Sequence, residues 1–170
     1  MKESKVAGYI TDALFELLKT KNLQDITTTE IITKAGVCRS SFYRNFYLPE
    51  DVIRQYGIRM FNDINRNIPL AQGSIRAHIL AVNTYFWSQQ ERLSLIEKRG
   101  LFYLLEGPIM EHCMLQMHRM DQWRTRYVAD FFTGSTTQLI RAWIRNGFEE
   151  SPQEITDIVC ELIKLEPANE

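Results

Sequence analysis

The 170-residue sequence is poor in the residues that mark several classes of protein. It contains only three Cys, five Pro and eight Gly. The cysteines are Cys38, Cys113 and Cys160, and their odd number and wide spacing argue against a disulfide framework and against a paired-Cys zinc site. Hydrophobic residues make up 45% of the chain. This composition excludes collagen-like, fibrous and disordered chains and indicates an ordinary globular protein.

Long apolar runs are also missing. The longest uncharged stretch, residues 77–90, contains Asn83, Ser88 and Gln89. A membrane-spanning helix needs about 20 mostly apolar residues, so this stretch does not qualify. The charged start of the chain has no apolar signal-peptide core. We therefore expect a soluble, cytoplasmic protein with no membrane partner.

The chain lacks a net excess of either charge, since 20 Lys and Arg stand against 21 Asp and Glu. The two signs are not evenly distributed. Residues 1–66 carry ten basic and eight acidic side chains, whereas residues 67–170 carry ten basic and thirteen acidic ones. An anionic partner would therefore be expected to meet the N-terminal third of the chain.

Helical periodicity runs through the whole sequence, and no segment shows the sustained alternation of a strand. The pattern predicts an all-α protein of eight or nine helices with short connections. Gly107 and Pro108 are expected to break the chain between one helix ending at Leu105 and another starting at Ile109. Ser151 and Pro152 are expected to open the last helix.

Two short helices near the N-terminus carry the clearest functional signal. Thr27 to Glu30 fits a capping box, and Gly36 follows where a turn requires a positive φ. The next helix, residues 38–46, should bury Phe42 and Phe46. The opposite face would then present the polar and basic residues Arg39, Ser40, Tyr43 and Arg44, with Ser41 and Asn45 on its flanks.

A helix with such a face fits the major groove of DNA, where Arg donates two hydrogen bonds to guanine and hydroxyls or amides reach bases or phosphates. The preceding helix supplies Thr27 and Thr28, whose hydroxyls and free N-terminal amides are expected to hold a phosphate. Together the two helices predict a helix-turn-helix.

Residues 10–52 resemble the DNA-binding domain of the TetR family of bacterial transcriptional regulators. The residues that carry the resemblance are Leu17, Ile26-Thr27-Thr28, Glu30-Ile31, Ala35-Gly36-Val37, Ser41-Phe42-Tyr43-Arg44 and Phe46. The resemblance implies an N-terminal helix-turn-helix domain, residues 1–48, and a C-terminal helical domain for effector binding and dimerisation, residues 49–170. Most members of the family repress, and release their operator when a small molecule binds.

Three residues depart from the pattern of the family. Cys38 stands where a Ser helix cap is usual, so we expect a weaker cap. Asn45 stands where His is common. Pro49 replaces a frequent phosphate-contacting Lys, which predicts lower affinity and a shallower dependence on salt.

The C-terminal segment suggests a pocket for a small hydrophobic or aromatic effector, although plain core packing explains the same residues equally well. The candidate residues are Tyr85, Phe86, Phe102, Tyr103, Met110, Met114, Met117 and Trp123. His112 and His118 fall on different sides of one helix, so no metal site is predicted. Arg119, Arg124 and Arg126 are interpreted as a solvated or acid-paired face rather than a second nucleic-acid site.

The last two helices offer more apolar surface than packing within one domain requires, which predicts a homodimer interface. The candidate residues are Phe131, Leu139, Trp143, Ile155, Ile158 and Leu162. Packing within the chain alone is the alternative. A two-fold dimer would place two recognition helices one helical turn of DNA apart and would select a palindromic operator.

The favoured hypothesis is therefore a homodimeric, DNA-binding transcriptional regulator, most simply a repressor released by a small effector, with no cofactor. The alternative is a TetR-like co-activator or adaptor that acts mainly through contact with another protein. The sequence shows no catalytic triad, paired carboxylates or phosphate-binding glycine loop, so it predicts no enzyme.

Overall fold

The computed structural model describes residues 5–67, 75–117 and 125–164. These ranges form nine α-helices and one short 3₁₀ turn, and contain no strand, as predicted. No helix within them is long and apolar enough to cross a membrane. The helices are α1 (Lys5–Leu18), α2 (Thr28–Ala35), α3 (Arg39–Asn45), α4 (Pro49–Asn67), α5 (Ile75–Ser88), α6 (Gln90–Lys98), α7 (Tyr103–Met117), α8 (Thr125–Arg145) and α9 (Pro152–Lys164).

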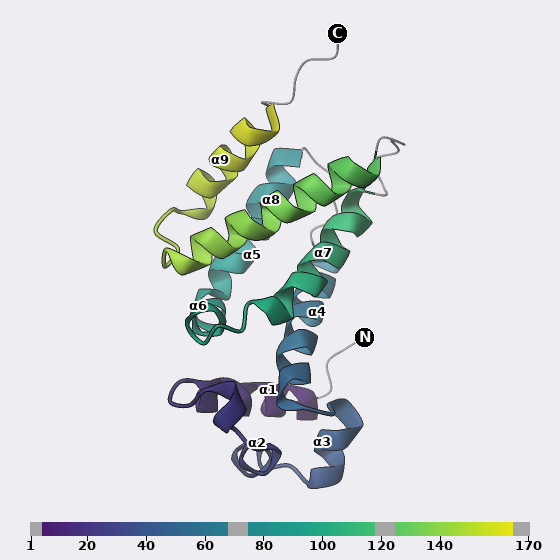
Figure 1. Cartoon of the computed structure of the whole chain (residues 1–170), viewed down its shortest axis with the longest axis vertical. Helices are drawn as coiled ribbons and strands as arrows, with labels where there is room; N and C mark the ends of the chain where they lie inside the picture. The colour runs from purple at the N-terminus through teal and green to yellow at the C-terminus, as the bar shows by residue number, and fades with distance from the viewer. Residues whose placement is uncertain (1–4, 68–74, 118–124, 165–170) are drawn as a thin grey trace.

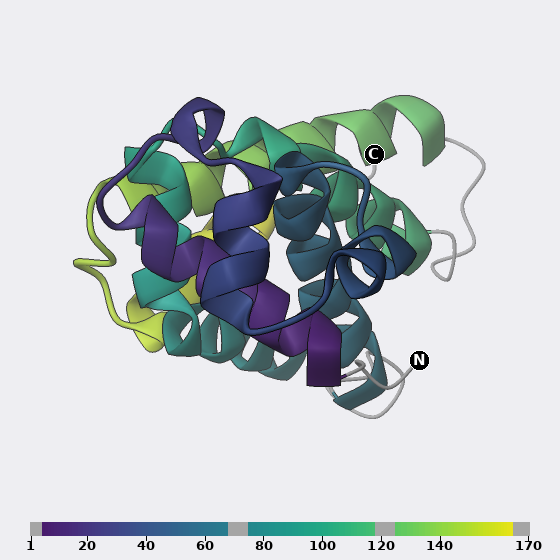
Figure 2. The same ribbon diagram turned by 90° about the horizontal axis from the view of Figure 1, so that it is seen from below.

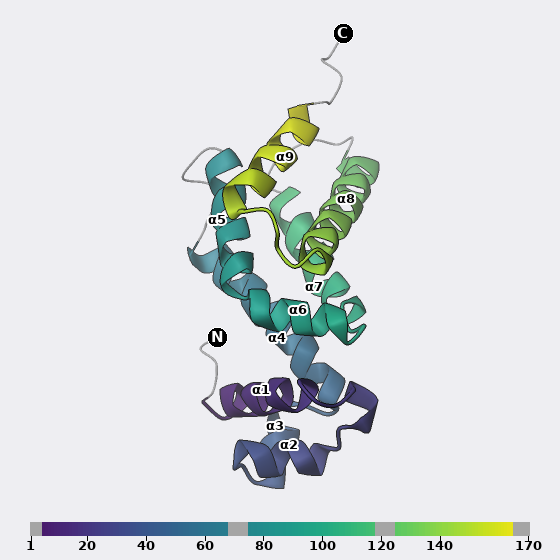
Figure 3. The ribbon, with the colours of Figure 1, turned by 90° about the vertical axis from the view of Figure 1, so that its left-hand side faces the viewer.

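The helices form two stacked groups (Figure 1). Helices α1, α2 and α3 make up one end of the molecule, and Figure 2 views this end directly. Helices α5 and α7 to α9 form the body, with α9 at the end far from α2 and α3. Figure 3 shows that α4 runs from the first group up into the second and that α6 lies across the junction beside α1.

Helix α4 is the element shared by the two groups. Its residues Val52, Ile53 and Ile64 are completely buried, and it packs on α1 near its start and along α7 farther on. A Cβ atom added at Gly57 would lie 2.8 Å from Leu105 Cδ2 of α7, so the two helices approach closely here and a larger residue would require the end of the Leu105 side chain to shift. The division of the chain at residue 48 stays a prediction.

The predicted break at Gly107 and Pro108 is wrong, because both residues lie inside α7. Proline normally interrupts a helix by removing one hydrogen bond and crowding the preceding turn. Here the Pro108 ring packs against α4, with its Cβ and Cγ atoms 3.4 Å from the position of a Cβ at Gly57. Tertiary packing against the neighbouring helix therefore outweighs the local preference for a break.

Two arginines of the α6 segment hold α1 against the body. Arg99 donates to the backbone oxygens of Leu18 (2.7 Å) and Lys19 (2.8 Å), where the unsatisfied carbonyls at the end of α1 attract a cation. Arg92 Nη2 lies 2.5 Å from Asp12 Oδ1 on α1, and its guanidinium covers the Phe15 ring at 4.8 Å. Charged side chains thus add contacts across the junction to the apolar packing of α4 on α1.

Candidate nucleic-acid interface

The N-terminus of α2 is a capping box, as predicted. The Thr27 Oγ1 atom accepts from the backbone N–H of Glu30 at 3.2 Å, while the Thr27 backbone N–H donates to the Glu30 carboxylate at 2.9 Å. The side chain of Lys21 and then Thr27 lower the pKa of Glu30 to about 2. The Thr27 hydroxyl also donates to Glu30 Oε2, so it is already engaged within its own helix.

Gly36 ends α2 with φ 65° and ψ 31°, in the left-handed region. This conformation suits glycine because it has no Cβ atom to clash with the backbone. The chain then turns and starts α3 at Arg39. The capping box of α2 and the turn at Gly36 depend only on nearby residues. Together they place α3 against α1 and α2.

Helix α3 divides into a buried and an exposed side. Phe42 is completely buried and Phe46 is 2% exposed, as the spacing predicted. The side chains of Arg39, Ser40, Tyr43 and Arg44 are exposed, and Ser41 and Asn45 are half-buried. The structure therefore brings the candidate DNA-contacting residues of α3 to one surface, while their contact with DNA remains a prediction.

Local contacts order this surface. The Arg39 guanidinium lies over the Tyr43 ring at 5.5 Å, and Tyr43 meets the buried Phe42 ring edge to face. The Asn45 side-chain amide donates to Ser41 O at 2.7 Å, so that N–H group serves its own helix rather than a base. The arrangement thus favours Arg39, Tyr43 and Arg44 as the side chains that reach outward.

One residue beside this surface was missed by the sequence interpretation. Tyr47, directly after α3, exposes 80% of its surface. Its backbone N–H, with that of Leu48, donates to Asp51 Oδ2 of α4, which fixes the loop next to the exposed face of α3. The signal in the sequence was an aromatic residue in the short connection between the buried Phe46 and Pro49.

Cys38 precedes α3 in the extended conformation of a helix cap but makes no capping hydrogen bond with its side chain. This geometry agrees with the weaker cap expected from the sequence, and the strength of the cap stays a prediction. The thiol instead lies 3.2 Å from Ser40 Oγ and 3.1 Å from Ser41 Oγ. Hydrogen bonds from Ser40 and then Ser41 lower the pKa of Cys38 to about 7.

Replacing Cys38 with Ser should raise the free energy of unfolding by about 0.5–1 kcal/mol, because a Ser hydroxyl accepts from a free amide of the first turn. Urea unfolding followed by circular dichroism measures the change. Cys38→Ala is the matched control, since it removes the sulfur without supplying an acceptor. An equal gain in both variants would mean that the cap is not the cause.

Two polar side chains lie buried inside the body without a hydrogen bond from the described part of the chain. His112 of α7 is 8% exposed and Thr133 of α8 is 6% exposed, and neither His112 Nδ1 nor Thr133 Oγ1 has a partner within those residues. The His112 ring stacks on Phe61 of α4 with centroids 4.9 Å apart. A buried polar atom that lacks a partner is costly, and a bound water, an ion or a functional role can account for it.

The described members of the predicted effector-pocket set differ in burial, and the pocket stays a prediction. Phe86 and Phe102 belong to the core, Tyr85 is half-buried, and Tyr103 and Met110 are 55% and 50% exposed. Trp123 and the side chains of Met114 and Met117 lie outside the described residues. Tyr103 and Met110 are exposed because they fall on the side of α7 away from α4, which an apolar residue type alone does not reveal.

Acid should destabilise the protein through His112. Burial first and the neighbouring His78 second lower the pKa of His112 to about 4, whereas an unfolded chain titrates near 6.5. The unfolded state therefore binds more protons between these values. The contribution of His112 to stability is complete above about pH 6.5 and falls by at most about 3 kcal/mol as the pH drops to 4.

Urea unfolding at pH 7.5, 6 and 5 measures this loss. His112→Gln removes the titrating group and should flatten the pH dependence across this window. A second variant, Glu149→Gln, changes an exposed carboxyl and serves as the control. If the His112→Gln protein kept the slope of the parent, another group would have to be responsible for it.

The predicted dimer-interface residues separate into two sets. Trp143 and Ile155 are 2% and 5% exposed, so their own chain already encloses them. The Trp143 indole N–H donates to Glu150 O at 2.9 Å and its ring contacts Phe148. Leu139 is half-buried, while Phe131, Ile158 and Leu162 are 70%, 41% and 54% exposed. Only the exposed members are available to a partner.

A helix-turn-helix group is joined by one shared helix to an all-helical body. Residues 101–165 match the TetR_C_8 family model, described as a transcriptional regulator C-terminal region. The C-terminal match and the fold described above make the chain similar to the TetR family of transcriptional regulators. No curated protein sequence matches the chain significantly.

Solved structures share the fold over nearly the whole chain. A TetR transcriptional regulator from Streptococcus agalactiae is 13% identical, with a TM-score of 0.64 over 94% of this chain and 93% of that one. The fatty acid degradation regulator FadR from Bacillus halodurans is 14% identical, with a TM-score of 0.63 over 100% of both chains. The dihydroxyacetone kinase operon activator DhaS is 16% identical, with a TM-score of 0.57 over 94% of both.

Proposed function

We propose that the protein is a homodimeric, sequence-specific DNA-binding regulator that represses from a palindromic operator and releases it when a small effector binds. The observation that carries this proposal is the exposed face of α3. Arg39 and Arg44 extend from a short helix whose opposite side is fixed in the core by Phe42. Exposed arginines on a rigid helix that ends the molecule suit insertion into the major groove.

The dimer is supported by the far end of the molecule. Ile158 and Leu162 lie four residues apart on α9, and both are exposed although they are aliphatic. Residues spaced in this way share one face of a helix, so they form a continuous apolar strip. A second copy of the chain that covers this strip through a two-fold axis would pair α9 with α9 and leave both α3 helices free for DNA.

An effector in the body is supported by the unsatisfied atoms of His112 and Thr133. Helices α7 and α8, which carry them, pack together. His112 is neutral at pH 7 because its pKa is about 4, so it offers a neutral hydrogen-bonding group among aromatic rings such as Phe61. A mainly apolar molecule with one polar group matches these surroundings.

Selection of bound fragments from random DNA tests the proposal. The expected product is a palindrome bound at nanomolar protein concentration, with affinity that falls as salt rises. A scrambled sequence of the same composition is the control. Equal affinity for the selected and the scrambled DNA at several salt concentrations would contradict sequence-specific recognition.

A second candidate is a co-activator or adaptor that acts mainly through contact with another protein. The fold it shares with an operon activator supports activation as an alternative to repression. So does Pro49 at the first position of α4, which carries no side-chain charge for a phosphate. If the purified protein binds no selected DNA alone but binds in the presence of a second regulator, this candidate replaces the first.

A further inference from the structure

Two large side chains are exposed in succession between α3 and α4. Tyr47 exposes 80% of its surface and Leu48 exposes 57%, although both follow Phe46, which is 2% exposed. Within the part of the chain that the structure describes, the Tyr47 hydroxyl makes no hydrogen bond. Tyr47 therefore presents to the outside an aromatic ring and a hydrogen-bond donor that those residues leave unused.

The backbone that carries these side chains is held in place. The N–H groups of Tyr47 and Leu48 donate to Asp51 Oδ2 at 3.1 and 2.9 Å, in the way that an acidic side chain of the first helical turn reaches back in a capping box. Asp51 Oδ1 also lies 3.4 Å from Arg54 Nη1. Because the connection is already ordered, a partner that binds there loses little affinity to the cost of ordering it.

Tyr47 lies beside the face of α3 that is proposed to contact DNA. Its Cα atom is two residues beyond Asn45, the last residue of α3, and so is at most about 7 Å from the Cα atom of Asn45. An α-helix is about 10–12 Å across and the major groove is about 12 Å wide, so a helix in the groove has phosphates along both sides. An exposed side chain just beyond the helix is therefore placed to meet the sugar and phosphate backbone.

The start of α4 offers no cation to such a phosphate. Pro49 is uncharged, and the acidic residues Glu50 and Asp51 follow it. Arg54 is exposed one turn farther along, but it pairs with Asp51. Tyrosine hydroxyls are among the neutral groups that donate to phosphate oxygens in protein–DNA complexes. A contact with phosphate at this end of α3 is thus best supplied by the Tyr47 hydroxyl.

We propose that Tyr47 contacts the DNA backbone at each half-site, with its hydroxyl donating to a phosphate oxygen and its ring against the adjoining sugar, and that Asp51 positions it. This inference rests on the proposed function, because it adds a contact to the same DNA-binding surface. Tyr47 touches the DNA, whereas Asp51 acts through the backbone of residues 47 and 48. The contact reads no base edge, so it adds affinity for any sequence.

Replacing Tyr47 with Phe removes the hydroxyl and keeps the ring. We expect affinity for the selected operator and for scrambled DNA to fall by a similar factor, about tenfold or more, because a homodimer loses two hydrogen bonds to charged oxygens. The slope of affinity against salt should stay unchanged, since no cation is lost. Fluorescence anisotropy at several salt concentrations measures both quantities. Tyr103→Phe, which removes the hydroxyl of an exposed tyrosine of α7, is the matched control.

Tyr47→Lys tests the position of the residue independently of the hydroxyl. A lysine beside a phosphate displaces a counterion, so the salt slope should steepen by about one ion for each protomer. Tyr103→Lys adds the same charge to the body and should leave the slope unchanged. Both side chains are more than half exposed, so the fold should be retained. An unchanged slope in Tyr47→Lys would place residue 47 away from the DNA and overturn the proposal.

The role of Asp51 is tested by the sign of its effect. Asp51→Ala frees the amides of residues 47 and 48, so DNA affinity should fall by about threefold or more, although loss of a negative charge alone favours an anionic partner. Glu50→Ala removes the same charge from a side chain that makes no hydrogen bond among residues 5–67, 75–117 and 125–164, and it should raise affinity. Circular dichroism verifies folding. Higher affinity in both variants would reject the positioning role.

The parent protein separates this inference from the proposed function. If the parent binds neither the selected nor the scrambled DNA, the function and the inference fail together. If the parent binds the selected palindrome and Tyr47→Phe binds it equally tightly, the regulator function stands and the contact by Tyr47 is rejected. A loss of affinity in Tyr47→Phe for the operator alone would mean that Tyr47 reads a base, which also contradicts a backbone contact.

Discussion

Replacing Arg39 and Arg44 together with Ala is expected to abolish measurable binding to the selected operator. A bidentate contact between arginine and a base is worth about 1–3 kcal/mol, and a homodimer loses each contact twice. Either single substitution should therefore weaken binding by about thirtyfold to ten-thousandfold, and the double variant by the product. Both side chains are exposed on α3, so the fold should not change.

Fluorescence anisotropy with labelled operator measures the loss, and circular dichroism verifies folding. Arg145→Ala is the matched control, because it removes an exposed arginine from the end of α8, in the body. The salt dependence then separates two roles. Loss of a phosphate contact lowers the slope by about one ion, whereas loss of a base contact mainly removes the preference for operator over scrambled DNA. Full affinity in the double variant would reject α3 as the recognition helix.

The features that the sequence predicted well are those set by neighbouring residues. The capping box at Thr27 needs only Glu30 three positions later, and the turn at Gly36 needs only a residue that accepts positive φ. Phe42 and Phe46 lie four residues apart, so the helical period alone puts them on one side of α3. These local rules explain why the surface proposed for DNA could be recognised before the structure.

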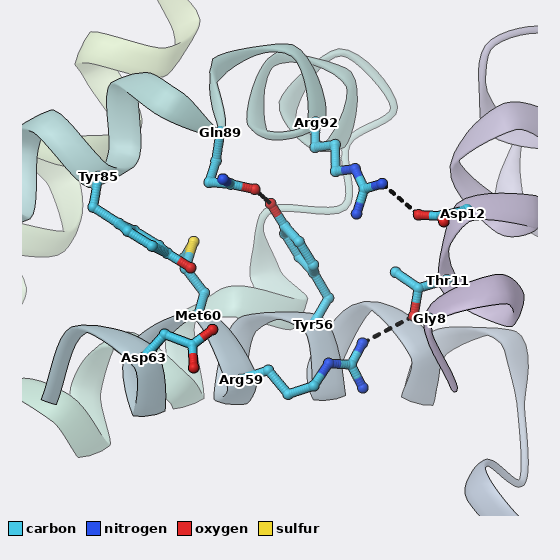
Figure 4. A pocket seen from close by; sticks show the side chains of 10 residues that line it. All are labelled: Gly8, Thr11, Asp12, Tyr56, Arg59, Met60, Asp63, Tyr85, Gln89 and Arg92. Atoms are coloured by element: carbon cyan, nitrogen blue, oxygen red, sulfur yellow. Dashed lines mark hydrogen bonds and ion pairs between the residues drawn. The ribbon is translucent and has the colours of Figure 1, made fainter. Parts of the chain in front are cut away.

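The features that the sequence did not reveal depend on distant residues. Arg92 contacts Asp12, which lies 80 residues away in the sequence, and Tyr56 contacts Gln89, which lies 33 residues away (Figure 4). No local sequence pattern predicts either pair. The pair of Arg92 and Asp12 joins α6 to α1, so it forms only once the two groups of helices have come together. Pro108 also depends on a distant residue. The local rule predicts a break in the helix there, but close packing near Gly57 of α4 keeps the helix continuous.

The prediction of the dimer interface shows a further limit. Periodicity identifies an apolar side of α8 and α9 but does not say whether that side faces the same chain or another copy. Trp143 and Ile155 face inward and are enclosed, whereas Ile158 and Leu162 face outward. Only a three-dimensional structure separates residues that complete a core from residues that remain for an interface.

The exposed residues Ile158 and Leu162 of α9 provide the second prediction, a large change in the oligomeric state. Replacing Ile158 and Leu162 together with Glu should convert the protein from a dimer to a monomer at micromolar concentration. Four glutamates would then face one another across the two-fold axis, and apolar surface that the dimer removes from water would be lost from the interface. Because Ile158 is 41% exposed and Leu162 is 54% exposed in the single chain, the substitutions should leave the fold of the monomer intact.

Sedimentation equilibrium measures the change in mass, and the DNA titration measures its consequence. A monomer holds only one half-site, so operator affinity should fall by about a hundredfold to ten-thousandfold, whereas affinity for an isolated half-site should change little. Tyr103→Glu with Met110→Glu is the matched control, since it places two glutamates on exposed apolar positions of α7 instead. A stable dimer of the α9 variant would mean that another surface joins the two copies. Loss of the dimer with full operator affinity would mean that a single chain recognises the whole site, and the palindrome would then have no explanation in the symmetry of the protein.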